Sequence, residues 1–155
     1  MERRAHVVFG SGVAAAAAWL LGLCPVDARA VWLLSWALLG STLPDADLRR
    51  RHRVLLHNLT AVALASAAVG LGLAMLGARE AALLAATGLA VGMGSHLLLD
   101  SFTVRGVALL FPLSGRRFRL LRLRSSSPAA NALFSTIGAA LLLAYIVHCG
   151  WAPPG

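Results

Sequence analysis

Seven histidine and aspartate side chains stand in short groups along this chain of 155 residues. Imidazole nitrogens and carboxylate oxygens together suit Zn²⁺, Mn²⁺ or Fe, and both groups can also transfer protons. A set of this size is large enough to hold one or two divalent ions. Its members are His6, Asp45, Asp47, His52, His57, His96 and Asp100.

Two spacings bring members of this set together locally. His96 and Asp100 are four residues apart, so they share one face of a helix and can bind the same ion. Asp45 and Asp47 flank a single alanine, and an extended backbone there would point both carboxylates the same way. Because neither spacing is specific on its own, the fold must bring the remaining members in.

The same side chains also have a simpler interpretation. Histidine and aspartate at the ends of apolar helices can lie in the polar interface of a membrane. The aspartates are also close in sequence to many arginines and could form ion pairs with them. Because ionisable groups within a membrane are costly and are functional by default, we favour a metal site.

The composition indicates a membrane protein. Hydrophobic residues make up 59% of the chain and charged residues only 13%, whereas soluble domains average about 25% charged residues. So little charge cannot cover a surface that faces water. The formal net charge of +8 therefore indicates an anionic membrane surface. Nucleic acid is not expected as a partner, since no recognised binding module is visible.

Five apolar runs predict an all-α bundle of about five, and at least four, transmembrane helices in a single domain, residues 1–155. Each long run approaches the roughly 20 residues that cross a bilayer core of about 30 Å. Only helices can cross singly, since each backbone polar group must be satisfied within the segment. The predicted spans are residues 5–23, 28–43, 54–76, 81–99 and 128–151.

The distribution of arginine predicts the orientation of the bundle, because short cytoplasmic loops are enriched in basic residues. With the N-terminus inside and the C-terminus outside, twelve arginines fall in inner segments and only Arg29 and Arg79 in outer loops. Residues 116–124 mix arginine with apolar residues. This basic segment before the last helix either lies in the membrane interface or is an ordinary solvated inner loop.

Alternatives remain at the N-terminus and at the two cysteines. Residues 1–30 resemble a cleavable signal peptide, but the apolar stretch exceeds the usual length of about 7–15 residues, so we favour an uncleaved first span. Lipid attachment at Cys24 is disfavoured because Leu23 is too large for such a site. Cys24 and Cys149 both fall at predicted outer helix ends, where they either pair in an oxidising exterior or stay buried as free thiols.

The predicted spans gather the seven side chains at the inner membrane face. They would arrive from the start of the first span, the loop after the second, the start of the third and the end of the fourth. Arg53 and Arg105 would lie at the same face, where guanidinium groups could hold a phosphate.

These motifs resemble the YdjM-like family, whose members are described as membrane-bound metal-dependent hydrolases. The resemblance covers residues 1 to about 120, and it implies that the seven histidines and aspartates are the polar signature of the family. Val54, Leu56 and Asn58 stand where the family pattern has Gly, Thr and Ser. The segments that carry the resemblance are Leu43-Pro44-Asp45-Ala46-Asp47, His52-Arg53, His57, His96-Leu97-Leu98-Leu99-Asp100-Ser101-Phe102-Thr103, Gly106 and Phe111-Pro112.

Together, these features predict a metal-dependent hydrolase of the inner membrane that acts at the cytoplasmic face on an ester or phosphodiester. Its partner would be a membrane lipid, such as an anionic phospholipid, and its cofactor one or two divalent ions, Zn first and Mn or Fe as alternatives. The alternative is a non-enzymatic membrane protein whose polar cluster is structural or binds a cation for transport. The expected roles are metal binding by Asp45, Asp47, His57, His96 and Asp100, catalysis by His6 and His52, and substrate binding by Arg53 and Arg105.

Overall fold

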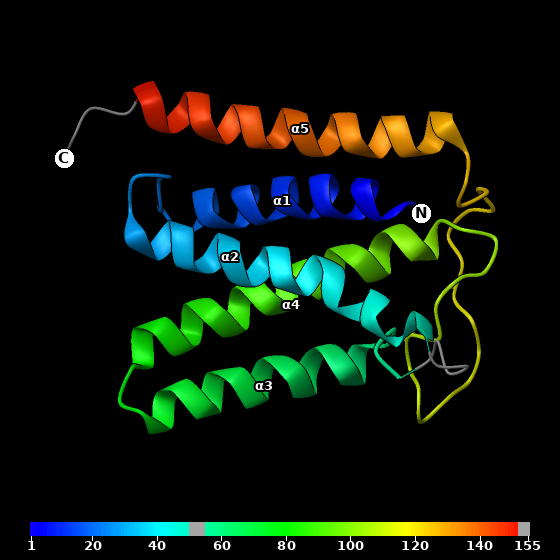
Figure 1. Ribbon diagram of the computed structural model, residues 1–155, viewed down its shortest axis with the longest axis horizontal. Coiled ribbons are helices and arrows are strands. Elements are labelled where there is room, and N and C mark those ends of the chain that lie inside the picture. Colours follow the sequence, from blue (N-terminus) through cyan, green and yellow to red (C-terminus); the bar gives the residue numbers. More distant parts are fainter. Residues whose placement is uncertain (50–54, 152–155) are drawn as a thin grey trace.

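The computed structural model describes the backbone of residues 1–49 and 55–151, and the side chains of these residues except 47–49 and 151. This part of the chain forms α-helices and one short 3₁₀ helix and contains no β-strand, which confirms the predicted all-α fold. Successive helices run back and forth along the long axis of the molecule (Figure 1). The elements are α1 (Arg3–Leu20), α2 (Ala28–Thr42), η1 (Leu43–Arg49), α3 (Leu59–Met75), α4 (Arg79–Ser101) and α5 (Pro128–Trp151).

Two of the helices are long and apolar enough to cross a membrane. These are α4 and α5, while α3 is apolar but shorter. Five crossings and their orientation therefore stay predictions.

The helix boundaries follow from local capping. The Asn58 side chain accepts a hydrogen bond from Ala61 N at 2.7 Å, so α3 begins at Leu59 and not at the predicted residue 54. At the start of α2, Asp27 accepts from Arg29 N at 2.8 Å. Hydrogen bonds from the Arg29 side chain and backbone also lower the pKa of the Asp27 carboxyl.

The backbone around Asp45 differs from the expected extended form. The α-helical part ends at Thr42, just before Leu43-Pro44, and residues Leu43–Arg49 follow it directly as a 3₁₀ helix. Proline lacks an amide donor but is accepted in the first turn of a helix, where that donor has no partner anyway. Asp45 therefore projects from a tight helical turn, and the predicted alternation with Asp47 does not apply.

Glycines let α2 and α4 approach closely. A Cβ on Gly92 of α4 would lie only 2.0 Å from the carbonyl oxygen of Ala37 in α2, and one on Gly40 would lie 2.6 Å from Leu89 O. Only a residue without a side chain fits at these two places. Helices in membranes associate through such small residues, since lipid provides no hydrophobic force between them. The close approach positions the end of α2 against the last turns of α4.

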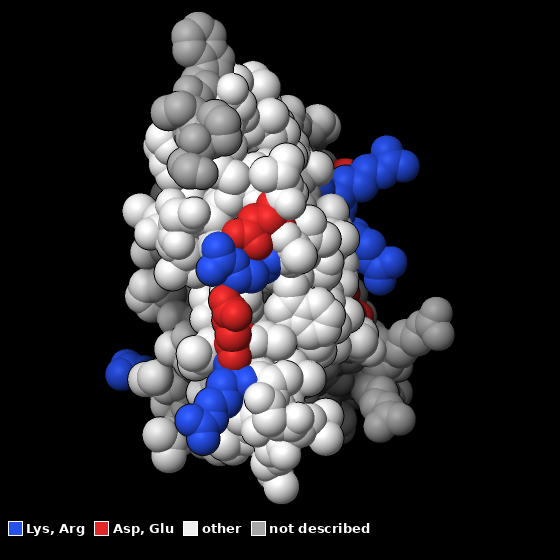
Figure 2. All heavy atoms as spheres, turned by 90° about the vertical axis from the view of Figure 1, so that its left-hand side faces the viewer, with Lys and Arg blue, Asp and Glu red and all other residues white. Residues whose placement is uncertain are grey.

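A disulfide joins the turn after α1 to the last turn of α5, at the end of the bundle opposite His6 and His96. Cys24 and Cys149 are paired, with a Cα–Cα distance of 5.6 Å, which decides the alternative that the sequence left open. At the same end Arg29 pairs with Asp27 at 2.7 Å and with Glu80 at 3.5 Å. Figure 2 views this end, where a short row of alternating charge crosses a face that is otherwise largely uncharged.

Candidate metal centre

Five of the predicted site residues meet at one end of the bundle. His6 lies in the first turns of α1, Asp45 in η1, and His57 just before α3, while His96 and Asp100 lie near the end of α4. All these segments reach the end of the molecule that carries the N-terminus (Figure 1). The up-and-down course of the helices is therefore what joins groups that are far apart in sequence.

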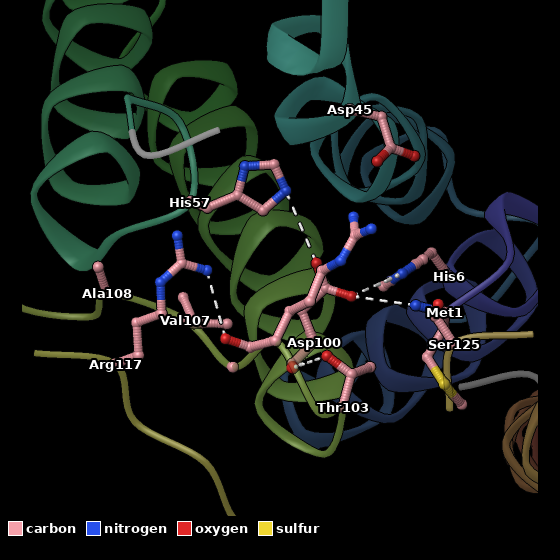
Figure 3. Close-up of a pocket in the computed structure, with 12 residues that line it drawn as sticks. Met1, His6, Asp45, His57, Asp100, Thr103, Val107, Ala108, Arg117 and Ser125 are labelled. Atoms are coloured by element: carbon pink, nitrogen blue, oxygen red, sulfur yellow. Dashed lines mark hydrogen bonds and ion pairs between the residues drawn. The ribbon is translucent and has the colours of Figure 1, made fainter. Parts of the chain in front are cut away.

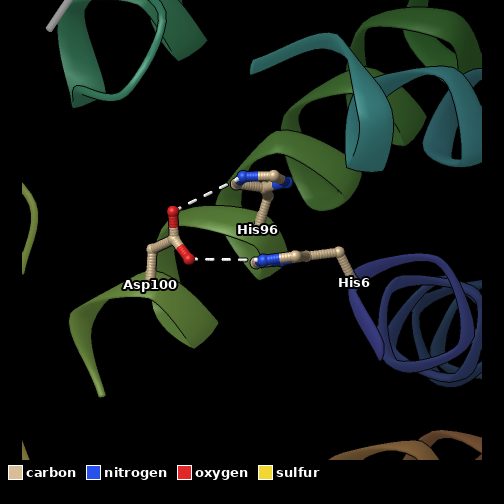
Figure 4. A group of neighbouring side chains, drawn as sticks. All are labelled: His6, His96 and Asp100. Atoms are coloured by element: carbon tan, nitrogen blue, oxygen red, sulfur yellow. Dashed lines mark ion pairs between the residues drawn. The ribbon is translucent and has the colours of Figure 1, made fainter. Parts of the chain in front are cut away.

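Asp100 is at the middle of the cluster. Its Oδ1 lies 3.2 Å from His6 Nε2, and its Oδ2 lies 3.7 Å from His96 Nε2 (Figure 4). The rings of His6 and His96 stack with a centroid distance of 3.8 Å. One ligand atom from each of these three residues lies within 4.8 Å of the others, so the three can hold one ion.

A second group of possible ligands shares His96 with the first. His96 Nε2 is 3.7 Å from Asp45 Oδ1, and the set is completed by His57, with all three ligand atoms within 4.8 Å of one another. His57 Nε2 also lies 3.7 Å from Asp100 Oδ2, so the two groups are in contact. Because the two groups share the one free nitrogen of His96, they are alternative positions for a single ion.

The separations fit the size of a metal ion. Ligand atoms about 2.0–2.1 Å from a tetrahedral Zn²⁺ lie roughly 3.3 Å from one another. The separations of 3.2 Å from His6 Nε2 to Asp100 Oδ1 and 3.7 Å from His96 Nε2 to Asp100 Oδ2 are close to this value. Two imidazoles and a carboxylate around one ion also match the ligand types of known zinc sites.

The tautomer of His96 suits metal binding. Its Nδ1 lies 2.8 Å from the carbonyl oxygen of Ser41, which can only accept a hydrogen bond, so the proton is on Nδ1. Nε2 then has its lone pair directed into the cluster, where it is buried and makes no hydrogen bond with a described residue. Since a backbone carbonyl commonly orients a metal-binding imidazole in this way, Ser41 provides outer support that the sequence did not reveal.

The ion pairs around the cluster test the simpler interpretation, in which the aspartates serve only to pair with arginines. Asp45 lies 3.9 Å from Arg3 Nε, but the Arg3 side chain is 72% exposed, and exposed pairs of this kind contribute only about 0–1 kcal/mol. The contacts of Asp100 are with the three histidines and with the amino group of Met1, which lies 3.2 Å from Oδ1. Among the residues whose side chains the structure describes, the two aspartates are therefore contacted mainly by imidazoles and by the Met1 amine.

A cavity of about 210 Å³ opens beside the cluster (Figure 3). Asp45 and Asp100 line it from η1 and α4, and His57 lines it from the turn before α3. Arg105 and Arg117 line it from the irregular segment between α4 and α5. Arg105 was predicted to bind substrate and does lie at the cavity. Arg117 was not singled out, because nothing in the local sequence distinguishes it from the other arginines of residues 116–124.

Three predicted site residues cannot be placed in the cluster. His52 and Arg53 lie outside the described residues, and so does the side chain of Asp47. Their predicted roles stay predictions.

Comparison with known proteins gives one match. The family described as YdjM inner membrane protein matches residues 1–153 of the chain. No curated protein and no solved structure shows a significant match. The family match agrees with the resemblance carried by the histidine and aspartate motifs. The chain belongs to the YdjM inner membrane protein family.

Proposed function

We propose that the protein is a metal-dependent hydrolase of the inner membrane that cleaves an ester or phosphodiester, such as that of a phospholipid head group. The observation that carries this proposal is the pair of ligand groups that share His96 and border a cavity. A carbonyl orients the buried His96 imidazole so that Nε2 faces two carboxylates and makes no hydrogen bond with a described residue, an arrangement that suits a metal ligand.

The residues of the cluster divide into holding and proton-transfer roles. His96 would hold the ion together with Asp100 or with Asp45 and His57, and the mixture of nitrogen and oxygen ligands favours Zn²⁺. A bound divalent ion would supply an acidified water and polarise the substrate oxygen. His6 contacts Asp100 at 3.2 Å, so it can complete the ligand set or accept a proton at Nδ1, which has no hydrogen-bond partner among the described residues.

Two independent features support a site at the cytoplasmic face of a bundle that crosses the membrane several times. The twelve arginines of the predicted inner segments favour this orientation. The disulfide of Cys24 and Cys149 lies at the opposite end, and disulfides persist in oxidising compartments such as the periplasm. A cytoplasmic site could meet the phospholipid head groups of the inner leaflet directly.

The second candidate is a non-enzymatic membrane protein in which the cluster is structural or binds a cation. The amino group of Met1 favours this candidate, since it already compensates the charge of Asp100 at 3.2 Å. Such a protein would need no cavity beside the cluster.

Metal analysis and hydrolysis assays on the purified protein in detergent separate the two candidates. The wild type should contain a divalent ion and hydrolyse a phospholipid or a chromogenic phosphodiester, and Asp100→Ala and Asp45→Asn should lose both properties. His148→Gln, at the far end of α5, should retain both. A wild type that binds no metal and is not stabilised by added Zn²⁺ or Mn²⁺ would exclude the hydrolase.

The orientation has its own test. Reporter fusions after Arg119 should give a cytoplasmic signal, and fusions after Gly155 a periplasmic one. A periplasmic signal after Arg119 would contradict the proposed location of the site.

A further inference from the structure

A second cavity, of about 340 Å³, shares one lining residue with the cavity beside the cluster. Its apolar wall is formed by Leu59, Leu109, Leu110 and Phe118, and Arg116 and Arg117 also line it. Arg117 lines both cavities. One guanidinium therefore stands between a polar space beside the ligand cluster and an apolar cleft.

The backbone fixes the position of this arginine. Val107 and Phe118 exchange two hydrogen bonds, of 3.0 and 2.7 Å, and so tie the two sides of the segment together next to Arg117. The Arg117 guanidinium donates from Nη1 to the carbonyl oxygen of Arg105 at 3.3 Å (Figure 3). Because a guanidinium carries five donors in a fixed plane, it has further donors with which to bind an anion.

The apolar cleft lies beside the start of an apolar helix. Leu59 is the first residue of the apolar helix α3, and Leu110, which also lines the cleft, is 58% exposed. A ligand that fills both cavities must then carry a negative charge next to an apolar chain.

We infer that Arg117 binds the phosphate of a membrane lipid and that the adjoining cleft takes one acyl chain of the same lipid. This assignment rests on the proposed hydrolase for its reaction, but the binding itself needs no turnover. Arg117 would act as a specificity-determining residue that selects a phosphate-bearing lipid over an uncharged one. The cleft would select the lipid over a water-soluble phosphate.

The test measures binding to the full-length protein after chelation of metal, in an uncharged detergent, by isothermal titration calorimetry. The probes are dodecyl phosphate and inorganic phosphate. The wild type should bind dodecyl phosphate at least about tenfold more tightly than inorganic phosphate. Arg117→Gln should weaken the binding of dodecyl phosphate by about tenfold, because a hydrogen bond to one charged group contributes about this factor to affinity.

Two further variants make the result specific. Arg122→Gln removes the same charge from the same segment but lines neither cavity, so it should change the affinity by less than about twofold. Leu110→Ser should weaken the binding of dodecyl phosphate and leave the affinity for inorganic phosphate unchanged. If Arg117→Gln fails to fold, Arg117→Lys tests the same point, because lysine keeps the charge but lacks the planar fork and should still weaken binding.

Equal losses in Arg117→Gln and Arg122→Gln would reduce the effect to general surface charge and overturn the inference. Equal affinity for dodecyl phosphate and inorganic phosphate would overturn the acyl-chain cleft. Because metal is removed before the measurement, a selective loss in Arg117→Gln supports the lipid site even if the hydrolase fails.

Discussion

Replacing His96 with glutamine should weaken metal binding at least as strongly as any other single change in the cluster. His96 is a member of both ligand groups, whereas each of the other four residues belongs to one. Glutamine is polar and of similar length, so the site keeps much of its shape but loses the Nε2 lone pair. The side chain is fully buried, and the variant therefore loses some stability for reasons unrelated to metal.

The contribution of the metal can be separated as the gain in stability on adding it. With free Zn²⁺ at 100 times its dissociation constant, the native state gains about 2.7 kcal/mol. Loss of an outer residue that orients a metal ligand weakens metal binding by about 10–100-fold. Loss of the ligand His96 itself should therefore weaken zinc binding by at least about 100-fold. The gain then falls to roughly 0.4 kcal/mol at the same concentration. At about 2–4 °C per kcal/mol, the shift in Tm falls from roughly 5–11 °C to roughly 1–2 °C.

The assay is thermal unfolding in detergent with and without Zn²⁺, together with metal analysis of the purified protein. His148→Gln is the matched control, since His148 packs on Trp19 at the far end of the bundle and should keep the full zinc-dependent shift. A zinc-dependent shift of equal size in the His96 variant and the wild type would refute the assignment of His96 as the shared ligand.

Three other predictions concern the scaffold. Gly92→Leu should destabilise the protein by about 2 kcal/mol or more and reduce its metal content, because any Cβ would meet the main chain of α2 at 2.0 Å. The control is Gly94→Ala, whose Cβ would have nothing within 4 Å, and its free energy of unfolding should stay within about 0.5 kcal/mol of the wild type. Cys24→Ser should lower stability by about 2–4 kcal/mol while the metal content at the opposite end is retained; loss of metal would contradict the separation of the two ends. The pKa of Asp27 is lowered in the folded state by Arg29, so its stabilising effect is present above the unfolded pKa and is lost as the pH falls through the folded one. Wild-type Tm should therefore decline in acid below about pH 4 more steeply than that of Asp27→Asn, and parallel curves would show that this pair contributes nothing.

Part of the site could be predicted from local sequence alone. The spacing of His96 and Asp100 forces both onto one face of a helix, and they do lie together. Asp45 was rightly placed near the cluster, although its backbone is a 3₁₀ turn and not an extended strand. The local conformation after Pro44 depends on how α2 continues, which the residue types there do not specify.

Other contacts depend on long-range packing and could not be predicted. Ser41 O reaches His96 only because glycines let α2 and α4 touch, and Arg117 was one arginine among several until the segment between α4 and α5 was folded. The pairing of Cys24 with Cys149 was likewise open, since it depends on how the ends of α1 and α5 meet.

By itself, the sequence determined that the chain is apolar, helical and rich in arginine. The free energy of exposing apolar residues to water depends on composition alone, and the hydrogen bonds of a helix join residues that are close in sequence. It also determined which side chains could bind a metal. Only the tertiary structure decided which of them meet. Contacts such as His6 with Asp100, 94 positions apart in the chain, arise from the close packing of whole helices, and this information is spread over every residue at their interfaces.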